Sequence, residues 1–188
     1  MRLLIATKQK ETGFTLIEIL VATIMLGVMA AIASPGMLAF VARSKVSSAH
    51  NQLQGGLQEM QREAIKRSQD CEITFPASGT TSSSQANDVL EVTSNCLVAG
   101  PLELEGVRIR HNLPDTDTDP DNTILDLFDF KGQTDTALSN DVAIVITQED
   151  SDKFQKCIAI SDGVGIIRSG FYTTNLSTVS ISNCDPTS

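Results

Sequence analysis

Several patterns that carry chemistry in other proteins are missing from this sequence. It has four cysteines but no Cys-x-x-Cys pair, and it has only two histidines, which argues against a zinc site. It has no glycine-rich loop of the kind that cradles phosphate. Neither histidine lies near a cysteine or serine motif that would form an activated nucleophile. We therefore expect that the protein is not an enzyme.

Positive charge is also scarce. The chain has 14 lysines and arginines against 23 acidic residues, and its formal net charge is −9. An acidic surface repels the phosphate backbone, so binding of bulk nucleic acid is disfavoured, although a local basic patch is compatible with this balance.

Apolar residues are concentrated near the amino terminus. Residues 16–42 contain a single charged residue, Glu18, and as a helix this run would be about 40 Å long. A bilayer core needs about 20 apolar residues, whereas the apolar region of a cleaved secretory signal has about 7 to 15. The run therefore predicts a membrane-spanning helix. The basic residues Arg2, Lys8 and Lys10 precede it and would hold the amino terminus in the cytoplasm.

Two residues in this run are unusual. A lone carboxylate in hydrocarbon is costly, so Glu18 would mark function and need a partner, unless it lies at the membrane interface. Pro35 removes a helical hydrogen bond and Gly36 weakens the helix further. We therefore expect the span to bend or open locally near Pro35.

The stretch Gly13-Phe14-Thr15-Leu16-Ile17-Glu18 resembles the processing and methylation signature of type IV pilins and type II secretion pseudopilins. A short basic leader ends at Gly13, as it does in that family. The resemblance implies that a prepilin peptidase cuts between Gly13 and Phe14 and methylates the new amino terminus at Phe14. It also implies that Glu18 and Pro35 are assembly residues. Inside the apolar filament core, Glu18 would meet a subunit's positive amino terminus or a neighbour's polar group.

The same resemblance implies a location and partners. The chain would wait in the bacterial inner membrane, surrounded by lipid, with its carboxy-terminal domain outside the cytoplasm. An inner-membrane assembly platform would then insert it among other pilin subunits, in a periplasmic pseudopilus or a cell-surface pilus. The implied function is that of a structural subunit, a minor pilin or pseudopilin, with no cofactor.

A second helical pattern follows the apolar run. Apolar residues recur at steps of three and four and form one stripe, so we expect a single helix from about residue 15 to residue 68. Its amphipathic part would pack on a globular domain; a free amphipathic helix is the alternative. The expected divisions are a leader at 1–13, a membrane or filament-core helix at 14–42, an amphipathic continuation at 43–69 and a β-rich domain at 70–188. The stripe residues are Val46, Ala49, Leu53, Leu57, Met60 and Ala64.

Beyond residue 70 the sequence changes to short runs rich in valine, isoleucine and phenylalanine, separated by turn residues. This pattern predicts an antiparallel sheet assembly on the helix stripe, which is a pilin-like α+β fold. The expected strands are 71–75, 89–93, 102–110, 124–130, 142–147, 157–161, 164–168 and 179–182.

Export of this domain would place its cysteines in an oxidising compartment. Four cysteines allow three pairings. We favour Cys71–Cys96 and Cys157–Cys184, because each closes a loop of about 25 residues, worth roughly 3 kcal/mol in the chain-entropy model. Free buried thiols are the alternative.

Acidic residues alternate in the stretch DTDTDPDN. Oxygen ligands at alternate positions suit calcium, and residues 115–126 approximate a twelve-residue calcium loop. However, Pro120 stands where that loop needs glycine, and residues 124–130 are typical of a strand rather than a helix. A calcium ion and a plain solvated acidic loop therefore both remain open. The candidate ligands are Asp115, Asp117, Asp119 and Asp121.

The stretch Phe128-Asp129-Phe130-Lys131-Gly132 precedes the predicted strand 142–147, and residues 158–168 follow it. This order is similar to that of the H-type pseudopilins and their type IV pilus relatives, a minor-pilin group that ends in two strands joined at a glycine turn. Some relatives implicated in DNA uptake carry Gly-Arg-x-Arg at this turn. The present sequence has Gly165-Ile166-Ile167-Arg168 and keeps only the second arginine. The alternative function is therefore a pilus-tip binding module for DNA uptake or exoprotein recognition, with Arg168 as the candidate DNA contact.

Overall fold

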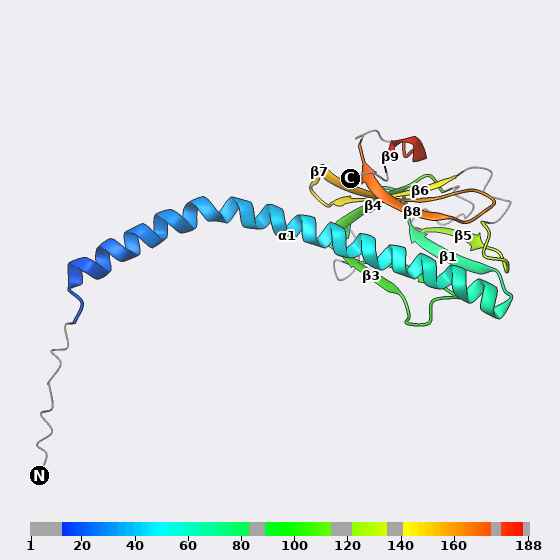
Figure 1. The fold of residues 1–188 in the computed structure, drawn as a ribbon, viewed down its shortest axis with the longest axis horizontal. Helices are drawn as coiled ribbons and strands as arrows, with labels where there is room; N and C mark the ends of the chain where they lie inside the picture. Colours follow the sequence, from blue (N-terminus) through cyan, green and yellow to red (C-terminus); the bar gives the residue numbers. More distant parts are fainter. Residues whose placement is uncertain (1–12, 83–88, 114–121, 135–140, 174–177, 186–188) are drawn as a thin grey trace, which may run out of the picture. The chain divides into compact units, whose positions relative to one another are not determined.

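The computed structural model describes residues 13–82, 89–113, 122–134, 141–173 and 178–185, with the side chains of residues 33–35 and 122–124 left aside. The chain divides into two compact units, residues 1–40 and 41–188. Helix α1, Leu16–Arg67, contributes to both units, which are described separately below (Figure 1).

Helix α1 has a defined start and end. Thr15 caps its amino terminus, and its last turn carries Lys66 and Arg67, where cations interact favourably with the helix dipole. The helix stops where Ser68 takes a left-handed conformation, with φ of 52°. These limits agree with the predicted helix.

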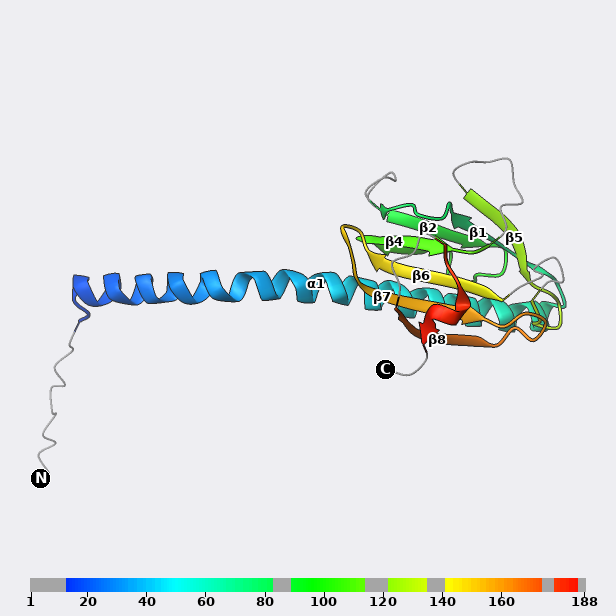
Figure 2. The ribbon, with the colours of Figure 1, turned by 90° about the horizontal axis from the view of Figure 1, so that it is seen from above.

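The second unit contains two antiparallel sheets. The four-stranded sheet has the order β3-β2-β1-β5 and the five-stranded sheet the order β4-β6-β7-β8-β9 (Figures 1 and 2). A long helix followed by antiparallel sheets confirms the predicted α+β class. Among the described residues the strands are β1 Cys71–Pro76, β2 Val89–Ser94, β3 Leu102–Glu105, β4 Val107–His111, β5 Asn122–Phe128, β6 Val142–Gln148, β7 Ser151–Ile160, β8 Ile167–Tyr172 and β9 Cys184–Asp185.

The core of this unit lies between the helix stripe and the inner faces of both sheets. All six predicted stripe residues, from Val46 to Ala64, are buried and belong to one cluster with strand residues such as Ile73, Leu104 and Ile158. Burying a large apolar side chain of this kind stabilises a fold by about 1.5–3 kcal/mol. Because this core is built from residues 46–160, the second unit carries its own hydrophobic core.

Several predicted strands need correction. The strand predicted at 102–110 is wrong, because Gly106, with φ of +64°, divides it into β3 and β4, which belong to different sheets. The strand predicted at 164–168 is shifted: residues 162–164 form a turn, and β8 begins at Ile167. At 179–182 there is no strand; the short 3-10 helix η3, Ile181–Asn183, precedes β9.

Two other strands have different ends from those predicted. β7 begins at Ser151, six residues before the predicted strand at 157–161, and β5 ends at Phe128, so residues 130 and 131 lie in a turn.

The disulfides join Cys71 to Cys96 and Cys157 to Cys184, which is the pairing favoured by loop length. The second bridge lies in a small cluster on the outer face of the five-stranded sheet, with Val145, Tyr172 and Val179. It fixes the end of the described chain to β7.

Candidate functional site

The structure describes how the amino-terminal helix begins. The backbone N–H of Glu18 donates to the Thr15 hydroxyl at 3.3 Å and to the Thr15 carbonyl at 3.1 Å. Thr-x-x-Glu before an apolar run is the sequence signature of a capping box, and it would have identified Thr15 as the cap, a role that the sequence analysis did not assign. Glu18 is therefore the acidic residue of the first turn, where a carboxylate interacts favourably with the helix dipole.

The two predicted processing residues directly precede this cap. Gly13 and Phe14 lie outside the helix and both are exposed, and apart from its chain neighbours no described residue comes within 4 Å of a Cβ built on Gly13. The bond between them is therefore accessible in the described segment.

The helical part of the first unit is apolar on all sides. Its large apolar side chains are exposed, from 43% at Val21 to 83% at Leu16. A helix with this character is normally buried in a membrane or among other helices, because exposed apolar surface of this extent is unfavourable in water.

By length and composition, no single straight helix of the described chain qualifies as a membrane span. The pieces Leu16–Ile32 and Gly36–Arg67 qualify only together, as a pair joined at a bend.

At the carboxy-terminal end of α1 the structure brings together three segments that the sequence analysis did not connect. The Gln61 side-chain amide donates to the Gly132 carbonyl at 2.7 Å and to the Gly165 carbonyl at 2.9 Å. A Cβ at Gly165 would lie 2.5 Å from the Gly132 carbonyl oxygen, and Gly165 has φ of +69°. The glycine of the Gly165-to-Arg168 stretch is therefore required by packing.

Arg168 itself is exposed on β8, opposite Ala159 of β7. Its proposed contact with DNA stays a prediction. The candidate calcium ligands Asp115, Asp117, Asp119 and Asp121 lie outside the described residues. Within the described ranges, no group of three or more histidine, cysteine, aspartate or glutamate residues is placed to hold a metal ion.

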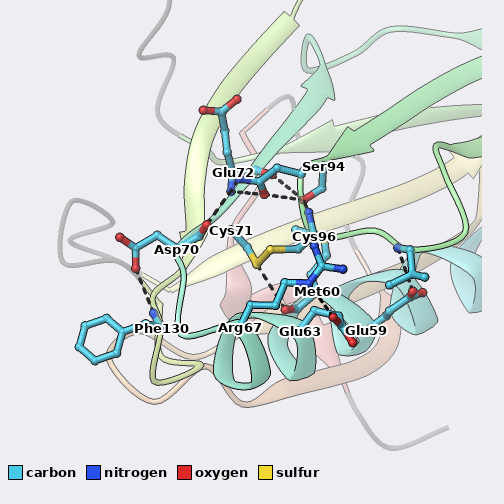
Figure 3. The surroundings of a disulfide bond; sticks show 12 residues. Glu59, Met60, Glu63, Arg67, Asp70, Cys71, Glu72, Ser94, Cys96 and Phe130 are labelled. Atoms are coloured by element: carbon cyan, nitrogen blue, oxygen red, sulfur yellow. Dashed lines mark hydrogen bonds and ion pairs between the residues drawn. A yellow bond between two sulfur atoms is a disulfide. The ribbon is translucent and has the colours of Figure 1, made fainter.

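The first disulfide lies against α1. Cys71 and Cys96 are almost fully buried, and the Cys71 sulfur is 3.5 Å from the Met60 carbonyl oxygen (Figure 3). Beside it, Asp70 accepts a hydrogen bond from the Phe130 N–H at 3.0 Å, and the Phe130 ring points away from the bridge (Figure 3).

His50 is a buried titratable group between α1 and β7. Its Nε2 is 3.2 Å from the Cys157 carbonyl oxygen and its Nδ1 is 3.3 Å from the Asn51 amide oxygen. Burial lowers the pKa of His50, and the nearby Lys156 acts in the same direction, while the two hydrogen bonds oppose them. His50 therefore lies in the packing between the helix and the sheet, and in its neutral form the ring donates to only one of these two oxygens.

Comparison with known proteins finds two similarities, each over part of the chain. Residues 8–34 match the family described as Prokaryotic N-terminal methylation motif. The chain is also similar to the fimbrial protein EcpC of Eikenella corrodens, with 49% identity over 49 residues. That similarity covers 26% of this chain and 31% of the relative. No solved structure matches the chain.

The motif and the fimbrial relative agree with the resemblance to the type IV pilin and pseudopilin family, and each similarity covers only part of the chain. They do not distinguish the H-type group within it.

Proposed function

We propose that the chain is a minor pilin or pseudopilin, a structural subunit that prepilin peptidase cleaves between Gly13 and Phe14 and that an inner-membrane platform inserts among other pilin subunits. One observation carries this proposal: an exposed helical segment, apolar on all sides, lies within and directly behind the methylation motif. Such a surface needs lipid before assembly and neighbouring helices after it. The proposal assigns the chain no catalytic step and no cofactor.

Within this proposal Glu18 sets the position of the helix in the filament. A carboxylate among apolar helices must be paired, and two unit charges 4 Å apart attract by about 4 kcal/mol at an effective dielectric constant of about 20. Cleavage would create a positive amine at Phe14, four residues before Glu18. An amine of this kind on a neighbouring subunit is the partner we propose.

The proposed place in the family is the H-type group, in a secretion pseudopilus or a pilus. It is supported by β7 and β8, which are consecutive antiparallel strands joined through a turn that contains Gly163 and Gly165.

The test compares two substitutions in the same helix. Glu18→Leu should lower the amount of the chain in the sheared filament fraction at least about tenfold, without lowering its amount in the membrane, because the unpaired helix still partitions into lipid. Thr23→Val is the matched control, since the Thr23 hydroxyl donates to the Leu20 carbonyl of its own helix at 2.9 Å and needs no neighbour. Equal incorporation of the Glu18→Leu variant and the wild type would refute the proposed function.

A further inference from the structure

The far end of the second unit carries an exposed apolar surface, which we call the end surface: Ile65, Phe130, Val164 and Ile166. Their exposed fractions are 53%, 49%, 59% and 46%. They come from the end of α1, the turn after β5 and the connection from β7 to β8. The contacts of Gln61 and Ile65 with Gly132, and of Gly165 with Gly132, bring these segments together.

The backbone under the end surface is held firmly. Asp129 accepts hydrogen bonds from the N–H groups of Lys131 and Gln133 at 2.9 and 2.8 Å. Asp70 accepts from the Phe130 N–H, as described above. A surface fixed in this way loses little conformational entropy when it binds, so its apolar side chains are presented ready for a partner.

The charge beside the end surface is positive. Lys131 lies over the Phe130 ring, with its Nζ 5.2 Å from the ring centroid. Arg62, one helical turn before Ile65, is also exposed. Neither side chain forms an ion pair within the described part of the chain, whereas Asp70 and Asp129 hydrogen-bond to backbone N–H groups. An apolar partner flanked by carboxylates would fit this arrangement.

The same unit contains a pocket with this complementary character, which we call the acidic pocket. It has a volume of about 270 Å³ and lies between α1 and β3. Buried Ala49 and Leu104 line it together with Glu103 and Glu105, while Lys45, Ser48 and Gln52 complete the lining. This volume is below the usual range for drug-sized ligands and suits a single inserted side chain.

The negative charge of the acidic pocket is only partly balanced. Glu103 of β3 lies directly opposite Glu91 of β2, and like charges in this arrangement are destabilising. None of Glu91, Glu103 and Glu105 forms an ion pair with another described residue. The lining holds two carboxylates, Glu103 and Glu105, and one ammonium group, Lys45, so a further cation would be favourable.

We propose that the end surface of one copy of this chain docks into the acidic pocket of a second copy, with Phe130 entering the pocket and Lys131 meeting Glu103 and Glu105. The two surfaces are different patches about 24 Å apart along the same helical segment, from Ala49 to Ile65, and we take their contact to be head to tail. Contacts of this type build open arrays, and the inference rests on the proposed function with the added requirement that two copies of this chain be neighbours in the filament.

The experiment uses the full-length chain in its own cells, with Phe130→p-benzoylphenylalanine as a photo-crosslinker and two differently tagged copies. Light should produce a dimer that contains both tags, and mass spectrometry should place the crosslink within residues 102–105. Lys131→Glu or Glu103→Lys alone should lower the yield about fivefold or more, and the double variant should recover it, because each contact again joins opposite charges. All of these side chains are exposed, and circular dichroism of the purified variants checks the fold.

The controls are Lys153→Glu and Glu72→Lys, which reverse exposed charges outside both surfaces and should leave the yield unchanged. A crosslink to another region, or to another pilin or any other protein, would overturn the proposal, as would a double variant without recovery. Incorporation of the Glu18→Leu and Thr23→Val variants is scored in the same cells. If Glu18→Leu abolishes incorporation while charge reversal at Lys131 has no effect, the proposed function holds and the docking contact fails.

Discussion

Gln61 offers the sharpest test of how the second unit is held together. Its amide group donates to two carbonyl oxygens in two turns that are far apart in the sequence, Gly132 and Gly165. A typical hydrogen bond contributes about 1 kcal/mol net, and a carbonyl left without a donor in a half-buried position costs more. We therefore expect Gln61→Ala to lower the free energy of unfolding by about 2–3 kcal/mol.

Gln52→Ala is the matched control, because it makes the same change on the same helix. Gln52 is exposed and its amide reaches only Ser48, so its loss should stay within about 0.5 kcal/mol. Urea unfolding of residues 41–188, followed by circular dichroism, measures both variants. If the two variants lose the same stability, Gln61 does not join the turns in the way described.

Three further predictions use the same fragment. Gly165→Ala should lower the free energy of unfolding by about 1 kcal/mol or more beyond the loss in Gly163→Ala. Both glycines have φ near +70°, but only at Gly165 would a Cβ meet a carbonyl oxygen. Equal losses of stability in the two variants would contradict this steric argument. Because burial lowers the pKa of His50 below its usual 6.5, the unfolded chain binds a proton more readily than the folded chain. The free energy of unfolding should therefore be highest above pH 6.5 and fall below it, and the fall should be smaller in His50→Gln. Parallel pH profiles of unfolding for the two proteins would contradict this. Replacing Cys157 and Cys184 with serine opens a loop with a separation of 27 residues and should remove about 3.5 kcal/mol, measured by thermal unfolding; an unchanged midpoint would exclude the disulfide.

The sequence predicted the features that depend on local periodicity. The stripe from Val46 to Ala64 identified both the helix and its buried face, because steps of three and four residues place side chains on one side of a helix. The predicted end near residue 68 agrees with the observed end at Arg67. The favoured disulfide pairing followed from loop lengths alone.

Features that depend on distant contacts could not be predicted in the same way. Residues 102–110 alternate like one strand, and only the left-handed conformation at Gly106 shows that they serve two sheets. Gln61 looks like any polar helix residue, since its partners lie 71 and 104 positions away. The residues around Gly165 likewise give no sign in the sequence that this glycine packs against the Gly132 carbonyl.

The most direct test of the account is mass spectrometry of the amino-terminal peptide from the chain isolated from its own cells. The account predicts a chain that begins at Phe14 and carries a methyl group on its amine, because Gly13 and Phe14 precede the helix cap within the methylation motif. A chain that retains its leader, or that begins at any other residue, would contradict the central claim.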